Sequence, residues 1–243
     1  AMDDALRHSL TKLSHLHFVA TDEYARRVVQ LGEDPERVIV SGAPALDNLK
    51  TVKLLNREAL GQRYGVRLAA APLMITFHPV TLEYEQTEFY INELLEALSG
   101  WDIPMVFTAP NADTGGRGIE RKISEFAATR PHAQIVDNLG MQDYFSFMAI
   151  AAAMVGNSSS GLIESPSFQL PVVNVGTRQD GRIRADNVID VDCKRMDIER
   201  GIARALSDEF RESLAELVNP YGSQQASSTI VDYLKRVAID ELL

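Results

Sequence analysis

The chain has 243 residues, with 45% hydrophobic and 24% charged side chains and a formal net charge of −10. This composition is that of an ordinary globular protein long enough to bury a core. The negative charge disfavours nucleic acid or an anionic membrane as a partner, since both need a basic surface. The single cysteine, Cys193, excludes an internal disulfide and a cysteine-based metal cluster. No apolar run has the length of a membrane span and no signal peptide opens the chain, so we expect a cytoplasmic protein.

The first fifty residues predict alternating helices and strands. Residues 3–15 carry Leu6, Leu10 and Leu13 at helical spacing. A short strand follows at 17–20, a helix capped by Thr21 or Asp22 runs to residue 30, and a second strand spans 37–40. Helix–strand–helix–strand is a fragment of a parallel sheet and is too small to stand alone.

The next hundred residues repeat a strand-then-helix pattern after a connecting helix at 54–64. Apolar runs predict strands at 72–77, 104–108 and 133–136. Amphipathic segments predict helices at 88–98, 119–129 and 141–152. Beyond residue 182, a strand at 187–191 and helices at 196–206, 209–218 and 224–238 complete the pattern.

The stretch 151–182 contains the strongest functional signal. A buried strand at 151–155 leads into GNSSSG and an apolar helical segment, and a second strand spans 171–175. A helix that starts at the serines would direct unpaired backbone N–H groups at an anion, and Gly161 would let a ligand approach the backbone. Glu164, about one turn later, suits the two hydroxyls of a ribose. Arg178 and Arg182 follow the second strand and suit phosphate.

A plainer interpretation of this stretch stays open. Serine-rich turns before helices are common, and most of them only cap the helix. The anion-site interpretation gains from Glu164 and the arginines, because all of them follow predicted strands of an α/β pattern.

Alternating strands and helices predict a doubly wound parallel sheet, in which ligands bind beyond the carboxyl ends of the strands. The polar residues that follow predicted strands are therefore candidates for one site. They are His78, Asn111, Asp113, Arg117, Asn138, Ser158, Ser159, Glu164 and Arg178.

Several of these residues also allow a structural interpretation. His78 precedes Pro79 and either contacts a phosphate and exchanges a proton with it, or simply caps the strand end. Asn111 and Asp113 are also typical of an Asx turn, and Arg117 of a solvated helix start.

Other classes of site are disfavoured. The spacing of His8, His15 and His17 is not a known ligand pattern, so we expect neither a metal site nor a cofactor. The chain has no Gly-x-Ser-x-Gly elbow and no Walker lysine loop, so a serine hydrolase and a P-loop NTPase are unsupported.

Five motifs in this order resemble the hydrolysing UDP-N-acetylglucosamine 2-epimerases that serve sialic and other nonulosonic acid synthesis. They are DDALRHSLTKLSH, FHPVT, APNADTGGR, GNSSSGLIE and GTRQDGR, and the resemblance extends over nearly the whole chain. It implies a GT-B fold of two Rossmann-like domains, with UDP bound mainly by the C-terminal one. This chain would contain the C-terminal half and the tail of the N-terminal domain.

The resemblance also implies residue roles. His78 would contact the diphosphate and assist UDP departure, and Asn111, Arg117 and Asn138 would lie beside the substrate or UDP. Ser158 and Ser159 would hold the diphosphate, Glu164 the ribose hydroxyls, and Arg178 would line the same pocket. Asp4 is the candidate for chemistry on the sugar, beside Asp3, Arg7 and His8.

A full-length family member is expected to have about 140 more residues ahead of Asp3. Residues 1–50 would then be the tail of the N-terminal domain, 51–222 the nucleotide domain and 223–243 a crossover helix. We therefore expect a truncated chain with little or no turnover alone, because most of the carboxylates that act on the sugar would be missing.

The expected reaction of the parent enzyme takes UDP-N-acetylglucosamine or a UDP-diacetamido sugar. UDP is eliminated, water is added and the C2-inverted free sugar leaves, so the enzyme is both an isomerase and a hydrolase. A module that binds UDP or a UDP-sugar without chemistry and a GT-B glycosyltransferase domain stay open as alternatives. The open edges of the first strands and an apolar helix face also predict a homo-oligomer, a dimer or larger, or packing of residues 1–50 onto the neighbouring domain or chain.

Overall fold

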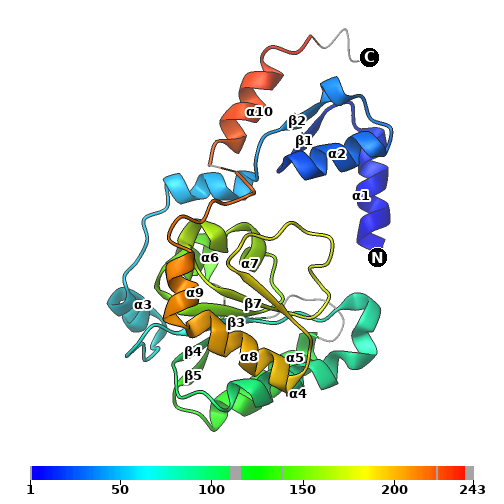
Figure 1. Ribbon diagram of the computed structural model, residues 1–243. Coiled ribbons are helices and arrows are strands. Elements are labelled where there is room, and N and C mark those ends of the chain that lie inside the picture. Colours follow the sequence, from blue (N-terminus) through cyan, green and yellow to red (C-terminus); the bar gives the residue numbers. More distant parts are fainter. Residues whose placement is uncertain (1, 110–115, 138, 223, 239–243) are drawn as a thin grey trace. The chain divides into compact units, whose positions relative to one another are not determined.

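The computed structural model describes residues 2–109, 116–137, 139–222 and 224–238. The chain divides into two compact units. Unit 1 combines Ala1–Val52 with Asn219–Leu243, and unit 2 is Lys53–Val218. Figure 1 shows the elements of both units, coloured from blue at the N-terminus to red at the C-terminus.

Unit 1 contains a short parallel strand pair with helices. Its elements are α1 (Met2–Leu13), β1 (His17–Val19), α2 (Asp22–Gln30), η1 (Pro35–Arg37), β2 (Val38–Val40), η2 (Pro44–Lys50) and α10 (Ala226–Leu234). Strand β1 pairs with β2 in parallel, with His17 opposite Val38. The Thr21 side chain accepts a hydrogen bond from the Tyr24 backbone N–H and caps α2, as its sequence position predicts.

Helix α10, distant in sequence, is tied into unit 1 at its amino end. The Asp47 carboxylate accepts hydrogen bonds from the backbone N–H groups of Ala226 (3.0 Å) and Ser227 (2.6 Å). A carboxylate at this position satisfies N–H groups that the helix leaves unpaired. The rings of Phe18 and Tyr233 pack edge to face at 5.7 Å, which joins α10 to β1.

Unit 2 is a six-stranded sheet covered by helices. Its strands are β3 (Leu73–Thr76), β4 (Met105–Thr108), β5 (Ala133–Val136), β6 (Ala153–Gly156), β7 (Val172–Val175) and β8 (Val188–Val191). Its helices are α3 (Arg57–Tyr64), η3 (Thr81–Gln86), α4 (Thr87–Leu98), α5 (Gly116–Ala128), α6 (Gly140–Ile150), α7 (Ser160–Ile163), η4 (Ser165–Phe168), α8 (Arg195–Leu206) and α9 (Asp208–Ser213).

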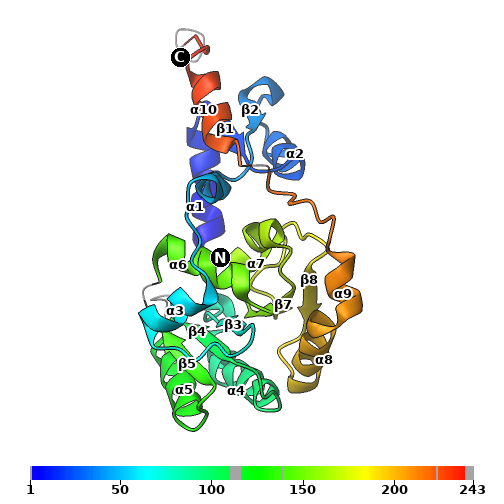
Figure 2. The ribbon, with the colours of Figure 1, turned by 90° about the vertical axis from the view of Figure 1, so that its left-hand side faces the viewer.

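The strands of unit 2 are all parallel and lie in the order β5-β4-β3-β6-β7-β8. Figures 1 and 2 show α4, α5 and α8 on one face of this sheet and α6 and α7 on the other. The chain order reverses between β3 and β6, and in doubly wound sheets the ligand crevice lies at such a switch point. The predicted doubly wound parallel sheet is confirmed.

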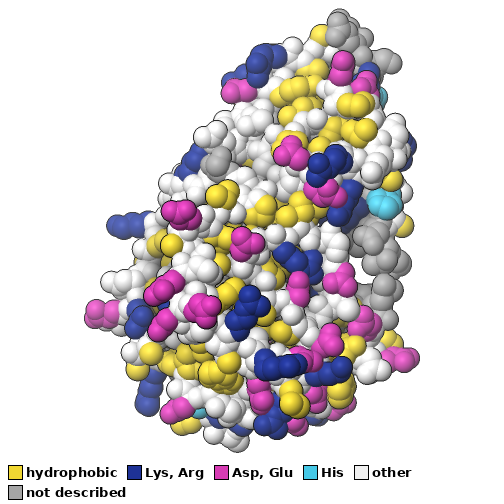
Figure 3. Space-filling view, viewed as in Figure 1, with side chains coloured by type: hydrophobic (Ala, Val, Ile, Leu, Met, Phe, Trp, Pro, Cys, Tyr) yellow, Lys and Arg dark blue, Asp and Glu magenta, His cyan; other side chains and the backbone are white. Residues whose placement is uncertain are grey.

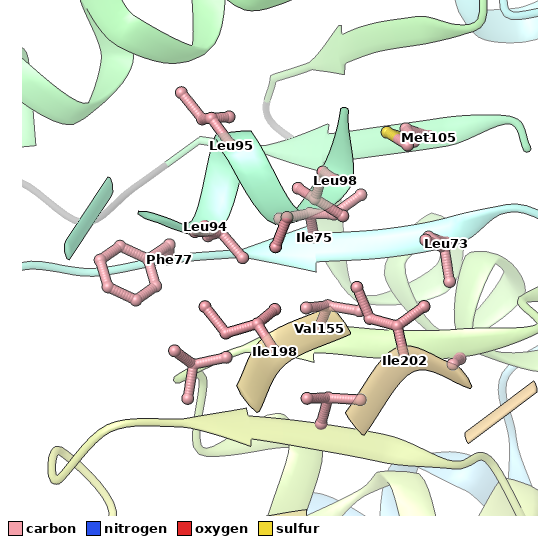
Figure 4. Close-up of a cluster of buried hydrophobic side chains, with 14 of the residues drawn as sticks. Leu73, Ile75, Phe77, Leu94, Leu95, Leu98, Met105, Val155, Ile198 and Ile202 are labelled. Atoms are coloured by element: carbon pink, nitrogen blue, oxygen red, sulfur yellow. The ribbon is translucent and has the colours of Figure 1, made fainter. Parts of the chain in front are cut away.

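The larger core of unit 2 lies between the sheet and α4, α5 and α8. Leu73, Ile75 and Phe77 alternate along β3 and its exit toward this side (Figure 4). They meet Leu94 and Leu98 of α4, and all five side chains are at most 1% exposed. Because strand side chains alternate, Met74 and Thr76 point to the opposite face of the sheet.

The helix after the serines, α7, has only four residues. Helix α7 ends at Ile163 and continues as the 3-10 turn η4, which contains Pro166. Proline has no N–H and its ring clashes with the carbonyl four residues earlier, so a long α-helix cannot pass through this position. A Cβ atom at Gly161 would lie 2.9 Å from the Val172 Cγ1 atom, so this glycine allows α7 to pack on β7. Its expected role in ligand approach stays a prediction.

Acidic and basic side chains are interspersed on the face of the molecule that Figure 3 shows. Among the residues that the structure describes, no helix combines the length and the apolar character needed to cross a membrane.

Candidate functional site

The candidate site begins where β3 and β6 lie side by side at their carboxyl ends. Gly156, the last residue of β6, pairs with Thr76 in the ladder. Its φ angle is +137°, and a Cβ atom there would lie 1.9 Å from the Thr76 carbonyl oxygen. Only glycine fits this position, and the close approach brings the two following loops together.

Asn157 joins these two loops. Its buried side-chain amide accepts a hydrogen bond from the His78 N–H (2.7 Å) and donates one to the His78 carbonyl (2.8 Å). The chain direction after β3 is thereby fixed, and His78 lies at the edge of a cavity.

This cavity has a volume of about 470 Å³ and lies beyond the carboxyl ends of β3, β4, β5 and β6. Its polar lining is mostly hydroxyl groups, and its other wall is largely apolar. The lining residues are Thr76, His78, Thr108, Ala109, Val136, Leu139, Gly140, Met141, Tyr144, Ser158 and Ser160.

The hydroxyl groups of the cavity are close to one another. The Thr76 and Thr108 Oγ1 atoms are 2.6 Å apart, and Ser158 Oγ lies 3.4 Å from both the Oγ atom and the backbone N of Ser160. Tyr144 of α6 adds a phenol among the Ser160, Ser158 and Thr76 hydroxyls. Burial raises the pKa of Tyr144 despite these hydroxyls, so the phenol stays protonated and is available as a donor.

The serine turn lies between β6 and α7. Ser159 is the N-cap residue of α7, yet within the described residues its side chain makes no capping hydrogen bond. Its carbonyl accepts hydrogen bonds from the N–H groups of Leu162 and Ile163. The serines on either side, Ser158 and Ser160, face the cavity.

Glu164 lies at the junction of α7 and η4. Burial raises the pKa of its carboxyl group to about 7, although its own backbone and the charge of Arg182 act in the opposite direction. Its Oε2 atom is buried and accepts no hydrogen bond from the described residues. A buried carboxylate oxygen without a donor is costly, which suits a group that accepts hydrogen bonds from a ligand.

The loop after β7 contacts the serine turn through the backbone of Asn157. The Asn157 carbonyl accepts hydrogen bonds from Arg178 Nη1 (3.1 Å) and Gln179 Nε2 (2.7 Å). Arg182, in the same loop, lies close enough to Glu164 to affect its pKa. The loop thus holds positive charge beside the turn, and part of the Arg178 guanidinium contacts the protein itself.

The remaining predicted residues lie elsewhere or outside the described part of the chain. Arg117 is exposed in the first turn of α5. Asn111, Asp113 and Asn138 lie outside the described residues. Asp4 belongs to α1 of unit 1, and its side chain is not among those described. The roles assigned to all the predicted residues stay predictions.

Sequence reasoning missed several residues that the structure brings to this place. Asn157 lies within the GNSSSG motif, where its residue type signalled only a turn, and Tyr144 lies in the predicted helix at 141–152, where no local pattern marked it as a site residue. Thr76 and Thr108 are the last residues of apolar strands. A polar residue at that position was the signal that could have identified them as site residues. Within the described residues, no group of three or more His, Cys, Asp or Glu side chains is placed to hold a metal ion.

Comparison with known protein structures supports the fold. The UDP-N-acetylglucosamine 2-epimerase of Neisseria meningitidis, solved with UDP-GlcNAc, has a TM-score of 0.78 at 19% identity, over 93% of this chain and 63% of that one. A structure of Staphylococcus aureus MnaA with UDP gives 0.76 at 20% identity, over 96% and 61%. The likeness shows the Rossmann-like fold of a GT-B half.

Comparison with protein sequences finds relatives at higher identity. The GDP/UDP-N,N'-diacetylbacillosamine 2-epimerase (hydrolyzing) of Campylobacter jejuni is 39% identical over 246 residues, which cover 100% of this chain and 64% of that protein. The UDP-N,N'-diacetylbacillosamine 2-epimerase (hydrolyzing) of Legionella pneumophila is 35% identical, over 98% of this chain and 62% of that protein. The chain thus spans less than two thirds of the length of these relatives. The sequence model of the family described as UDP-N-acetylglucosamine 2-epimerase matches residues 1–235, and the chain belongs to that family.

Proposed function

We propose that unit 2 binds UDP and UDP-sugars in the hydroxyl-lined cavity at the carboxyl ends of β3 to β6. The observation that carries this proposal is the cavity itself, of about 470 Å³ at the switch point of the sheet. It combines an apolar wall from Ala109, Val136 and Met141 with neutral donors and acceptors opposite. Such a lining suits a nucleoside, which has an apolar base face and polar edges.

The charged part of a nucleotide would lie toward the serine turn. His78, Ser158 and Ser160 supply an imidazole and two hydroxyls at one side of the cavity. We propose that they hold the diphosphate together with Ser159, while Arg178 supplies positive charge from the neighbouring loop. Glu164 would accept hydrogen bonds from the ribose hydroxyls, because its buried Oε2 atom has no donor among the described residues.

For the whole protein we propose a hydrolysing 2-epimerase of UDP-sugars. Loss of the C2 proton and departure of UDP from C1 give a glycal. Water then adds at C1, and a proton returns to C2 from the opposite face. Such an elimination needs a base at C2 and a group that stabilises or protonates the leaving diphosphate. His78 is our candidate for the second role. The names of the relatives at 39% and 35% identity favour a diacetamido sugar as the first substrate to test.

Unit 1 would belong to the other half of the enzyme. We propose that residues 1–50 are the tail of an N-terminal domain and that 223–243, with α10, form the crossover helix, while 51–222 form the nucleotide domain. Asp4 is the proposed sugar-side residue in this chain. Because further carboxylates are expected outside it, we expect UDP binding with little turnover by this polypeptide.

A titration calorimetry series tests the binding proposal. UDP is compared with uridine, with CDP and with inorganic pyrophosphate. We expect UDP to bind more tightly than uridine or pyrophosphate, because the cavity and the serine turn each recognise one part of it. Pyrophosphate binding as tightly as UDP, or no UDP binding at all, would contradict the proposal.

Adding a UDP-diacetamido sugar to the chain distinguishes the alternatives. Slow release of UDP and a free sugar supports an epimerase part, whereas binding without release fits a non-catalytic module. Release of UDP that depends on an added acceptor would instead indicate a glycosyltransferase.

We further propose that the protein is a cytoplasmic homo-oligomer, a dimer or larger. Leu6, Leu10 and Leu13 of α1 are 64%, 63% and 79% exposed, and their i, i+4, i+7 spacing places them along one side of the helix. Single exposed leucines are ordinary, but a row of them is typical of a covered surface. Light scattering that gives the mass of a monomer at high concentration would contradict this proposal.

A further inference from the structure

Asn157 is fully buried, and each of its polar groups has a partner. Its side-chain amide accepts from the His78 N–H at 2.7 Å and donates to the His78 carbonyl at 2.8 Å. Its own backbone N–H donates to the Thr76 carbonyl at 3.0 Å. These three contacts attach the serine turn to the chain that leaves β3.

The residue type matters because the Asn157 side chain makes the hydrogen bonds that a strand backbone would otherwise make at this position. The ladder between β3 and β6 ends at the pair of Thr76 and Gly156. Beyond it, Asn157 offers a peptide-like donor and acceptor to the backbone of His78. Aspartate has no donor for the His78 carbonyl, and an apolar residue has neither group.

The other side of Asn157 is bound to the loop after β7. Arg178 and Gln179 both donate to its carbonyl, at 3.1 and 2.7 Å. Asn157 therefore connects three loops, which follow β3, β6 and β7. His78 lines the cavity at the point where these loops meet.

From this geometry we propose that Asn157 is a positioning residue, which acts on the ligand by holding His78 in place at the cavity edge. The inference rests on the proposed function, in that the ligand is UDP. Its consequence is specific: a change at Asn157 should remove the part of the affinity that His78 supplies and leave the rest.

A double-mutant cycle measured by UDP calorimetry tests this consequence. The variants are Asn157→Asp, His78→Ala and the two together. We expect each single change to weaken UDP binding roughly tenfold, the size of one hydrogen bond to a charged group. The double variant should be no weaker than His78→Ala, because residues that act through one another are not additive.

Asn187→Asp is the matched control. Asn187 is also fully buried, and its amide donates to Ser165 Oγ at 2.8 Å and to the Leu170 carbonyl at 2.7 Å. It directly precedes β8, at the amino ends of the strands, and is not among the residues that line the cavity. We expect this variant to lose stability while UDP affinity stays unchanged.

A second measurement does not depend on UDP. The C2–H proton of His78 is followed by NMR through a pH titration, assigned by its loss in His78→Ala. Its chemical shift should move in Asn157→Asp and stay as in the wild type in Asn187→Asp. If Asn157→Asp does not fold, Asn157→Ser takes its place, since serine retains a donor.

Three results would overturn the inference: additive losses in the cycle, unchanged UDP affinity in the Asn157 variant, or an unchanged His78 resonance. If the wild type does not bind UDP, the proposed function fails. The His78 resonance then shows by itself whether Asn157 positions His78.

Discussion

Replacing Glu164 with glutamine should change how the stability of unit 2 depends on pH. Burial raises the pKa of this carboxyl from its ordinary 4.5 to about 7. The folded protein thus keeps a proton that the unfolded chain has already released. Each rise in pH between the two values therefore favours unfolding. The cost is absent below about pH 4.5 and complete above about pH 7.

The size of the effect follows from the two pKa values. At about 1.4 kcal/mol for each pH unit, the rise from 4.5 to about 7 corresponds to about 3 kcal/mol. Glutamine has no proton to release, so Glu164→Gln should avoid this cost. Relative to the wild type, the variant should gain about 2 kcal/mol in its free energy of unfolding between about pH 5 and about pH 8.

Urea unfolding followed by tryptophan fluorescence measures this difference. Trp101, the single tryptophan, packs against the core of unit 2 and reports its unfolding. Glu120→Gln, at an exposed position on α5, is the control for the loss of one carboxylate. The same pH dependence in Glu164→Gln and the wild type would refute the reasoning.

Three further predictions concern the fold and the cavity. Gly156→Ala should lower the free energy of unfolding in urea by about 3 kcal/mol or more, because a Cβ atom there would lie 1.9 Å from the Thr76 carbonyl oxygen. An unchanged unfolding midpoint would contradict this close approach. Asp143→Asn should cost about 2 kcal/mol near pH 7, because buried Asp143 accepts two hydrogen bonds from Arg63. Burial by itself would raise the Asp143 pKa, but the hydrogen bonds from Arg63 and Tyr64 and the charge of Arg63 together lower it. This difference should therefore shrink as the pH falls below the ordinary 3.8 and the carboxylate is protonated. Tyr144→Phe should weaken UDP binding about tenfold in calorimetry, whereas equal affinity would remove the phenol from the site.

Much of the fold follows from the spacing of apolar residues. The runs at 72–77 and 104–108 are short and rich in Met, Ile, Val and Phe, so they predict buried strands, and amphipathic segments between them predict covering helices. The strand order β5-β4-β3-β6-β7-β8 does not follow from the sequence in this way, because strand neighbours depend on tertiary packing and not on local pattern. The short length of α7, in contrast, has a local cause in the sequence, because Pro166 prevents a long α-helix at this position.

The candidate site was predictable where its residues directly follow strands. His78 and Ser158 were identified in this way, and both line the cavity. Tyr144 was not, because an aromatic residue in an amphipathic helix is usually a packing residue, and only the fold places its hydroxyl beside the serines. The role of Asn157 depends on a hydrogen-bond pair with a residue far away in the sequence, which no local pattern contains.

The central claim is that a uridine nucleotide occupies the cavity beyond β3 to β6. A crystal structure of the chain soaked with UDP tests it most directly. The account predicts electron density for the nucleoside against Tyr144 and Met141, with the diphosphate at Ser158 and Ser160 and the ribose at Glu164. Density for UDP at another place in the molecule, with this cavity holding only solvent, would contradict it.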